Sequence, residues 1–172
     1  SEMCIRDRYY YRTPEKPALT EVSFSNGYSL GQWTSNQVVL SYKNESEREY
    51  AGLQLGYVVN GQGEMKWKDM EQSDDTYSFG FTMSGEYTVA LRFKMADPNQ
   101  PGAFVYGEKL PLTEKVKIDL ETPNLMVSGY TSGTWSTEDV ALSLQNRTNQ
   151  ISGSQYQYAV SDLSLIHISE PT

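Results

Sequence analysis

Aromatic side chains beside charged or turn-forming residues are the part of this sequence best suited to hold a ligand. Trp67 stands between Lys66 and Lys68, and Phe104 and Tyr106 flank one valine inside a stretch rich in proline and glycine. Aromatic rings offer large apolar faces to sugars and peptides, so Trp67, Phe104 and Tyr106 are the candidate ligand-binding residues. For Trp67 the pattern favours the alternative, a cross-strand position in the core.

Acidic residues form two further groups, whose oxygen atoms are of the type that calcium prefers. The first group lies in "KDMEQSDD" (68–75) and consists of Asp69, Glu71, Asp74 and Asp75. The second would join a domain junction to a long connection and consists of Asp119, Glu121, Asn124, Asp97 and Asn99. Neither has the Asp-x-Asp-x-Asp-Gly spacing of a calcium loop, so we expect a solvated acidic turn and no bound metal.

Residue types give little support to enzymatic chemistry. Cys4 and His167 are the only residues of their types, and both lie in terminal stretches that resemble translated sequencing-adaptor sequence, 1–8 and 161–172. Outside those stretches the chain therefore has no nucleophilic triad and no zinc ligands of the histidine or cysteine type. It also has no Gly-x-Ser-x-Gly elbow, no phosphate-binding glycine loop and no signal that pairs two carboxylates. We expect a non-catalytic protein without a cofactor.

Charge and hydropathy argue against two classes of partner. The 172 residues carry a formal net charge of −8, and no block of basic residues is present. This balance argues against nucleic acid and against anionic membrane surfaces. No apolar run approaches the roughly 20 residues that cross a bilayer, so we expect no membrane insertion by this stretch.

Alternation of apolar and polar residues, the signature of half-buried strands, dominates the chain. It is clearest in 87–95, whose apolar positions are Tyr87, Val89, Leu91, Phe93 and Met95. Seven such strands within 18–120, with turn signals between them, predict an all-β immunoglobulin-like sandwich. Two sheets that bury their apolar faces against each other would hide all of these stripes.

Three local patterns refine this prediction. Tyr87 begins the penultimate strand, where a tyrosine corner would return its hydroxyl group to the backbone. Asn60-Gly61 predicts a tight hairpin, because both residue types accept a positive φ. The connection 97–111, with Pro98, Pro101 and Pro111, is longer than a bare sandwich needs and predicts a loop or a protruding hairpin.

The chain repeats itself. "GQWTSNQVVLSY" (31–42) and "GTWSTEDVALSL" (133–144) match at a constant offset of 102 residues, and "LGYVV" (55–59) meets "YQYAV" (156–160) at an offset of 101. Internal repetition at a fixed period indicates an array of similar modules. Recurrence of a tryptophan at one repeat position, Trp33 and Trp135, favours a packing role for both over sugar stacking.

These observations divide the chain into five parts. We expect non-native ends at 1–8 and 161–172, and the tail of a preceding repeat with its linker at 9–17. A complete sandwich repeat follows at 18–121. A partial second repeat, which breaks off after its third strand, occupies 122–160. The alternative for the C-terminal end is that "SLIHIS" forms a short apolar strand.

The junction "KVKIDLETPNLMVSGYTSGTWSTEDVALSL" (115–144) resembles the junctions between tandem bacterial Ig-like repeats of surface and secreted proteins. This resemblance implies export and an extracellular, cell-surface location, with neighbouring domains of the same polypeptide as partners. It implies a non-catalytic structural or spacer repeat. Two alternatives are a module that binds carbohydrate or host protein, as adhesins do, and an accessory domain that lies against an enzyme elsewhere in the protein.

Overall fold

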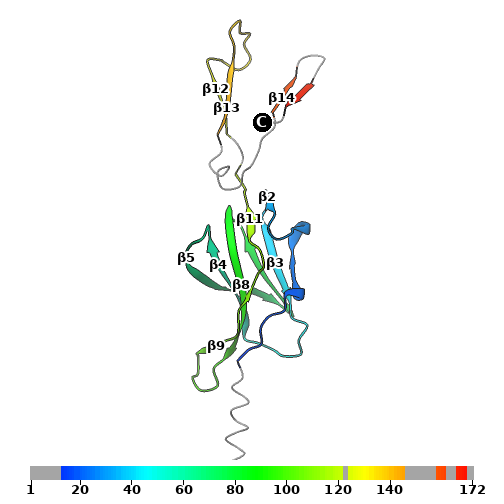
Figure 1. Ribbon diagram of the computed structural model, residues 1–172, viewed down its shortest axis with the longest axis vertical. Helices are drawn as coiled ribbons and strands as arrows, with labels where there is room; N and C mark the ends of the chain where they lie inside the picture. Colours follow the sequence, from blue (N-terminus) through cyan, green and yellow to red (C-terminus); the bar gives the residue numbers. More distant parts are fainter. Residues whose placement is uncertain (1–12, 122–123, 146–157, 162–165, 170–172) are drawn as a thin grey trace, which may run out of the picture.

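The computed structural model describes residues 13–121, 124–145, 158–161 and 166–169 (Figure 1). Within this part of the chain the helical elements are two single 3-10 turns, η1 (Leu19–Glu21) and η2 (Ser25–Gly27). All other regular elements there are strands: β1 to β11 form two facing sheets, and β12 to β15 form two separate hairpins. The predicted all-β sandwich is therefore confirmed. The predicted N-terminal non-native end lies outside the described residues.

The first sheet has the strand order β1–β3–β7–β6, and all its pairings are antiparallel. Its strands are β1 (Val22–Phe24), β3 (Val38–Lys43), β6 (Glu71–Ser73) and β7 (Thr76–Phe81). Along β3, buried Val38, Leu40 and Tyr42 alternate with more exposed residues, as a strand with one face on a core requires.

The second sheet has the order β2–β11–β8–β4–β5, with β9 and β10 also paired to β8. Its strands are β2 (Trp33–Thr34), β4 (Gly52–Val59), β5 (Gln62–Asp69), β8 (Gly85–Ala96), β9 (Phe104–Tyr106), β10 (Leu110–Pro111) and β11 (Val116–Ile118). The β2–β11 pair is parallel and the others are antiparallel. At twelve residues, β8 is the longest strand and the central one.

The core lies between the inner faces of the two sheets. Leu40 of the first sheet and Leu55 and Leu91 of the second are completely buried. Full burial of a side chain of this size contributes about 1.5–3 kcal/mol to folding. Phe93 adds aromatic contacts, edge-to-face with Tyr42 at a centroid distance of 5.7 Å and stacked on Tyr50 at 4.1 Å.

A tyrosine at the start of β8 fixes the crossing from the first sheet to the second. The Tyr87 hydroxyl group donates a hydrogen bond to the Met83 carbonyl oxygen at 2.7 Å, so the predicted tyrosine corner is present. Burial raises the pKa of the Tyr87 hydroxyl above its ordinary value, and the nearby Tyr57 raises it further. The neutral hydroxyl, which is the form that can donate this bond, is thus favoured.

The hairpin between β4 and β5 turns at Asn60 and Gly61, as their residue types predicted. Their φ values are 53° and 67°, both in the left-handed region that such two-residue turns require. The Asn60 side chain also accepts a hydrogen bond from the Glu86 backbone N–H at 2.9 Å. The turn is therefore fastened to the first residues of β8.

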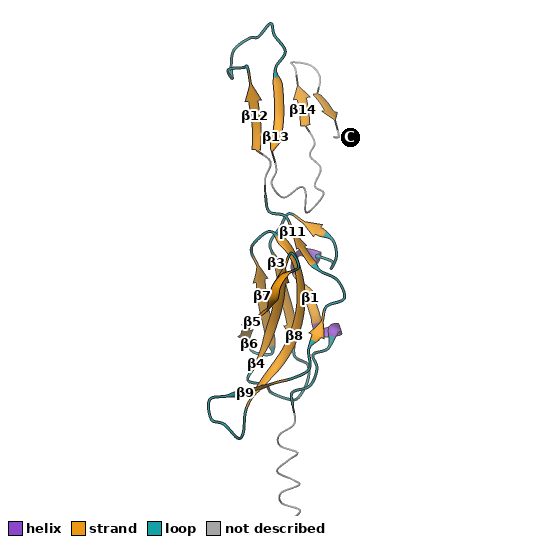
Figure 2. Cartoon of the chain, turned by 60° about the vertical axis from the view of Figure 1, so that its left-hand side comes forward, coloured by secondary structure: helices purple, strands orange, loops and turns teal. Residues whose placement is uncertain are grey.

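The connection after β8 is a protruding hairpin, the second of the two predicted alternatives (Figure 2). Strand β8 runs on to Ala96, and β9 pairs back onto its end, with Lys94 opposite Tyr106 and Ala96 opposite Phe104. This segment, residues 94–106, is called the β8–β9 hairpin below. It extends the second sheet beyond the sandwich at the end opposite to β11 (Figure 1).

Beyond the sandwich, β12 (Asn124–Ser128) and β13 (Ala141–Gln145) form a separate antiparallel hairpin. Val140 and Leu142 of this hairpin are 39% and 57% exposed, whereas Val38 and Leu40, their counterparts 102 residues earlier, are 2% and 0% exposed. Trp135 is fully exposed, so the predicted packing role is not realised for it here.

Strands β14 (Tyr158–Ser161) and β15 (Ile166–Ser169) form a second small hairpin. Strand β15 contains the end of "SLIHIS", so this part of the stretch forms a short strand, and the prediction that 161–172 is a non-native end stays a prediction. Residues 162–165 and 170–172 of the predicted non-native end lie outside the described residues.

Removal of the corner hydroxyl should weaken the fold. We expect Tyr87→Phe to lower the free energy of unfolding by about 0.5–1.5 kcal/mol, because the part-buried hydrogen bond to the Met83 carbonyl oxygen is lost. Urea denaturation of both proteins measures the difference. Tyr57→Phe is the matched control, since within the described residues no hydrogen bond involves the Tyr57 hydroxyl. Equal losses of unfolding free energy in the two variants would show that the hydrogen bond of the Tyr87 hydroxyl makes no special contribution to stability.

Candidate ligand-binding face

The outer face of the second sheet brings the candidate aromatic residues together. On β8 the buried residues Val89, Leu91 and Phe93 point into the core, so Arg92 and Lys94 point outward. Strand register then places Gln54 opposite both Arg92 and Asp69, and Gly56 opposite both Ala90 and Trp67. Strands β4, β5, β8 and β9 therefore build one continuous face.

Arg92 lies between two aromatic rings on this face. Its guanidinium carbon is 3.9 Å from the centroid of the Trp67 ring and 4.1 Å from the centroid of the Tyr106 ring. Cation–π contacts of this kind contribute about 0.5–1 kcal/mol each at exposed sites and more when desolvated. Trp67, Arg92 and Tyr106 are called the arginine stack below. It ties the β8–β9 hairpin to β5 across the width of the sheet.

A chain of polar contacts continues from the arginine stack along the face. The Arg92 Nε atom donates a hydrogen bond to Gln54 Oε1 at 3.0 Å, and Gln54 Nε2 donates to Asp69 Oδ1 at 3.0 Å. Asp69 also pairs with Lys94 Nζ at 3.0 Å. Lys94 Nζ in turn lies 4.3 Å from the centroid of the Phe104 ring. Each aromatic candidate is therefore held against a cation.

Both ends of this network, Asp69 and Arg92, are ionised at neutral pH. The pKa of Asp69 is lowered, first by the hydrogen bond from Gln54 and then by Lys94. Desolvation lowers the pKa of Arg92 below its ordinary value, and the nearby Tyr106 opposes that change. A guanidinium group stays protonated in proteins, so Arg92 carries its full positive charge at neutral pH.

Gly56 makes room for the indole ring of Trp67. A Cβ atom added to Gly56 would lie 2.8 Å from Cε3 of Trp67 and 2.7 Å from Sδ of Met65, which is closer than van der Waals contact allows. The Trp67 ring therefore lies directly over the backbone of β4. This explains why a glycine occurs in the middle of a buried strand, where it otherwise weakens pairing.

Trp67, Phe104 and Tyr106, the three candidates from the sequence, are thus close neighbours on one face. Phe104 and Tyr106 are each 41% exposed, and Trp67 is half-buried. The prediction that Trp67 occupies the core is wrong, because its strand register places it on the outer side of the sheet. The sequence-based reasoning also missed Arg92 and Lys94, whose outward positions in the period-two pattern were the available signal.

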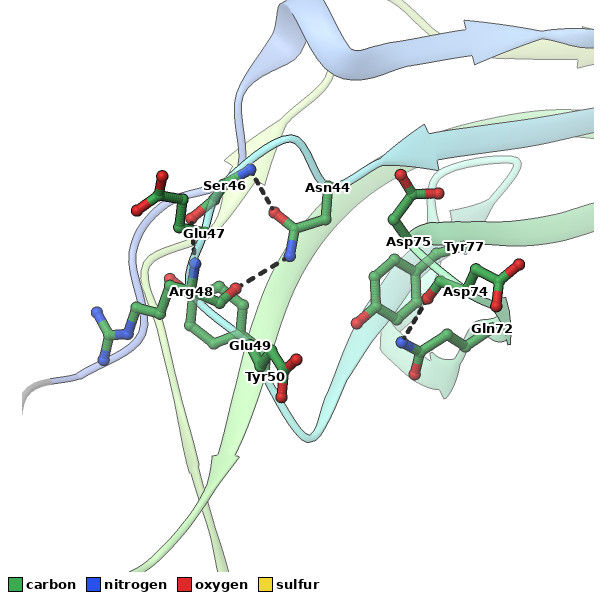
Figure 3. A pocket seen from close by; sticks show the side chains of 10 residues that line it. All are labelled: Asn44, Ser46, Glu47, Arg48, Glu49, Tyr50, Gln72, Asp74, Asp75 and Tyr77. Atoms are coloured by element: carbon green, nitrogen blue, oxygen red, sulfur yellow. Dashed lines mark hydrogen bonds between the residues drawn. The ribbon is translucent and has the colours of Figure 1, made fainter.

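The acidic residues of 68–75 do not meet at one point. Asp69 pairs with Lys94 on the outer face, while Asp74 and Asp75 line a cavity of about 480 Å³ at the end of the first sheet (Figure 3). Asp74 occupies the tight β6–β7 turn, with φ of 53°, and its carbonyl oxygen accepts a hydrogen bond from Gln72. Among the described residues, no three acidic, histidine or cysteine side chains form a group that could hold a metal ion.

The loop facing these two aspartates is closed by its own hydrogen bonds. Asn44 Nδ2 donates to the Arg48 carbonyl oxygen, and Asn44 Oδ1 accepts from the Ser46 backbone N–H (Figure 3). Arg48 also places its guanidinium carbon 5.1 Å from the centroid of the Tyr50 ring. These contacts account for the order of the loop without a ligand.

The second proposed calcium group is also dispersed. Asp119 follows β11, which pairs with the first residue of β8, whereas Asp97 and Asn99 follow the last residue of β8. Twelve residues of extended strand span roughly 40 Å, so the two sets lie at opposite ends of the sandwich. The side chain of Asn124 lies outside the described part of the structure.

Trp33 provides a second aromatic position on the outer face, far from the arginine stack. It is half-buried on β2, and Lys117 Nζ lies 5.9 Å from the centroid of its ring. Trp33 thus lies beside β11, and its predicted packing role stays a prediction.

Comparison with known proteins gives no match: neither a family model nor a curated protein sequence matches the chain. In the part of the chain that the structure describes, we find no helix with the length and apolarity needed to span a membrane.

The close fit of Trp67 over Gly56 generates a prediction. We expect Gly56→Ala to displace the indole ring and to lower the free energy of unfolding by about 1–3 kcal/mol, because the added methyl group overpacks the contact. Proton chemical shifts of the Arg92 side chain, which the two rings perturb, should move toward those of an exposed arginine.

Gly80→Ala is the matched control for this change. Gly80 also lies in mid-strand, and an added Cβ would meet only Thr82 Cγ2 at 3.9 Å. We expect its stability and its Arg92 shifts to stay at the wild-type values. Unchanged Arg92 shifts in Gly56→Ala would show that the indole position does not depend on this glycine.

Proposed function

We propose that this chain is a non-catalytic, Ig-like structural module from a tandem array in a bacterial cell-surface or secreted protein. The observation that carries the proposal is a turn that is built twice with the same hydrogen bonds, at an offset of 102 residues. Its role is mechanical: modules of this kind space other domains of the same polypeptide away from the cell.

The repeated turn comprises residues 28–34 and 130–136. In the first copy the Tyr28 hydroxyl donates to the Gln32 carbonyl oxygen at 2.7 Å, and in the second the Tyr130 hydroxyl donates to the Thr134 carbonyl oxygen at 2.7 Å. A backbone hydrogen bond at 3.3 Å also recurs in both copies, from Gln32 to Ser29 and from Thr134 to Thr131.

Backbone geometry supports the same conclusion. Gly31 and Gly133 occupy equivalent places in the two turns, and both have φ of 82°, which favours glycine. The strands before the turns pair with equivalent partners, Phe24 with Leu40 and Val127 with Leu142. The link from the first strand to its turn is one residue shorter in the second copy, so Val127 takes the place of Phe24 at an offset of 103.

Strand order supports the Ig-like assignment. In Ig domains, the first, second, fifth and fourth strands form one sheet, and the third, sixth and seventh form the other. The order β1–β3–β7–β6 in the first sheet and β11–β8–β4 in the second follows that pattern, with β5 added as an edge strand beside β4 and with the short strands β2, β9 and β10 as further additions. The tyrosine corner at the start of β8 belongs to the same pattern.

The path of the chain suits modules joined end to end. Pro14 lies against Gly107, near the β8–β9 hairpin, whereas β11 ends beside Gly85 at the other end of β8. The chain thus enters and leaves at opposite ends of the sandwich (Figure 1). A linker containing Thr122-Pro123 follows in the sequence, and proline stiffens such connections.

Small-angle X-ray scattering of a longer product of the same gene tests the spacer function. We expect further modules of about 100 residues and an increase in maximum dimension of roughly 40 Å for each, which is the length of a twelve-residue strand. A particle whose maximum dimension fails to grow with added modules would contradict end-to-end stacking. A reading frame without further copies of the turn would contradict the array itself.

A second candidate function, binding of carbohydrate or host protein, is favoured by one specific observation. Trp67 comes from β5 and both Phe104 and Tyr106 come from β9, and yet the three side chains gather on one face beside Arg92 and Lys94. Aromatic residues and arginine are enriched where proteins bind partners. The β8–β9 hairpin also projects beyond the sandwich, where neighbouring elements leave it accessible (Figure 2).

Retention of the chain on an array of glycans and extracellular host proteins tests this second function. We expect Phe104→Ala combined with Tyr106→Ala to abolish retention, because both side chains are exposed and their removal leaves the core intact. Met83→Ala, which truncates a 72% exposed side chain at the other end of β8, is the control. Retention that survives the double change would place the binding surface elsewhere.

A further inference from the structure

We propose that the arginine stack is a binding site for an acidic saccharide, with Arg92 holding the carboxylate of the sugar. This inference rests on the second candidate function, the binding module, and names the class of its ligand. The site consists of the outward edge of the Arg92 guanidinium group, the flanking rings of Trp67 and Tyr106, and the ammonium group of Lys109.

The first step concerns the donors of Arg92 that remain available. A guanidinium group has five N–H donors, and Gln54 accepts a hydrogen bond from the one on Nε. Within the described residues, no hydrogen bond or ion pair involves either Nη atom of Arg92. The two rings cover the faces of the group, so a ligand must approach along its edge.

The second step concerns the geometry of that edge. The two rings and Gln54 hold the guanidinium plane in one orientation before any ligand arrives, which limits the conformational entropy lost on binding. Two parallel N–H donors in a fixed plane match the two oxygen atoms of a carboxylate. The arrangement therefore selects a planar anion with two acceptor atoms.

The third step concerns charge. The chain carries a net charge of −8, yet no carboxylate of the described residues pairs with Arg92. Lys109 Nζ lies 5.5 Å from the centroid of the Trp67 ring and adds a second positive charge at the same place. Lys94, in contrast, is neutralised by Asp69 at 3.0 Å. The unpaired positive charge is thus concentrated at the arginine stack.

The fourth step separates an acidic sugar from other ligands. A neutral sugar would need an aromatic face for stacking, and Arg92 already covers one face of Trp67 and one face of Tyr106. An acidic peptide would need further unpaired cations beyond Arg92 and Lys109, whereas the next cation along the face, Lys94, is already paired. The site therefore offers donors for one carboxylate beside partly apolar ring edges. A single acidic sugar residue has matching groups.

Isothermal titration calorimetry of the full chain with sialyllactose and with a glucuronic acid disaccharide tests the proposal. Lactose, the carboxyl-reduced forms of both acidic sugars and a pentaglutamate peptide complete the set of probes. We expect binding of at least one acidic sugar. Carboxyl reduction should weaken that binding about 10- to 100-fold, the loss typical of a charge-assisted hydrogen-bond pair.

Arg92→Lys is the matched protein variant, because it keeps the positive charge and removes the forked donors. We expect a loss of affinity similar to that caused by carboxyl reduction. Arg48→Lys is its control, since Arg48 also lies over a tyrosine ring but belongs to the loop at the end of the first sheet. Its affinity should stay at the wild-type value. Carboxyl-reduced sugars test the site with wild-type protein, independently of how the variants fold.

The outcomes separate this inference from the function on which it rests. Binding of acidic sugars that weakens on carboxyl reduction and in Arg92→Lys supports the inference. Equal binding of lactose, or tighter binding of pentaglutamate, would overturn the acidic-saccharide site while leaving a binding module. Absence of binding to every probe would overturn the inference, and failure on the glycan and host-protein array would remove the binding function as well.

Discussion

The alternation of β8 between inward and outward residues is the constraint on which the rest of the molecule depends. Its inward side chains, Val89, Leu91 and Phe93, close the core against the first sheet, while its outward side chains, Arg92 and Lys94, carry the candidate site. A shift of one residue in its pairing would exchange the two sets and destroy both. The tyrosine corner and the Asn60 contact to Glu86 hold that register at the start of the strand.

Sequence patterns predicted the elements of the fold well, because period-two burial and turn chemistry are local properties. Asn60-Gly61, Tyr87 and the hairpin after β8 all behave as their residues predict. Trp67 was misplaced for a physical reason: periodicity assigns residues to two faces of a strand but does not say which face meets the core. That choice depends on the pairing of β5 with β4, where Gly56 provides the space for the indole ring.

The residues of the candidate site were even harder to predict from the sequence than the position of Trp67. Phe104 and Tyr106 could be selected from their unusual setting in the sequence, but Arg92 looks like any solvated polar residue of an alternating strand. Only the registers of three strand pairs bring it between two rings. The acidic residues considered for calcium show the converse, because Asp119 and Asp97, although similar in type, are separated by the full length of β8.

The parallel pairing of β2 with β11 has a mechanical consequence for a chain that is stretched from both ends. Residues 14 and 118 lie at opposite ends of the sandwich, so tension acts along the strands and not across them. The contacts between β2 and β11 would then be loaded together in shear, so they could not break one after another. Such a link resists rupture because its bonds must fail at once.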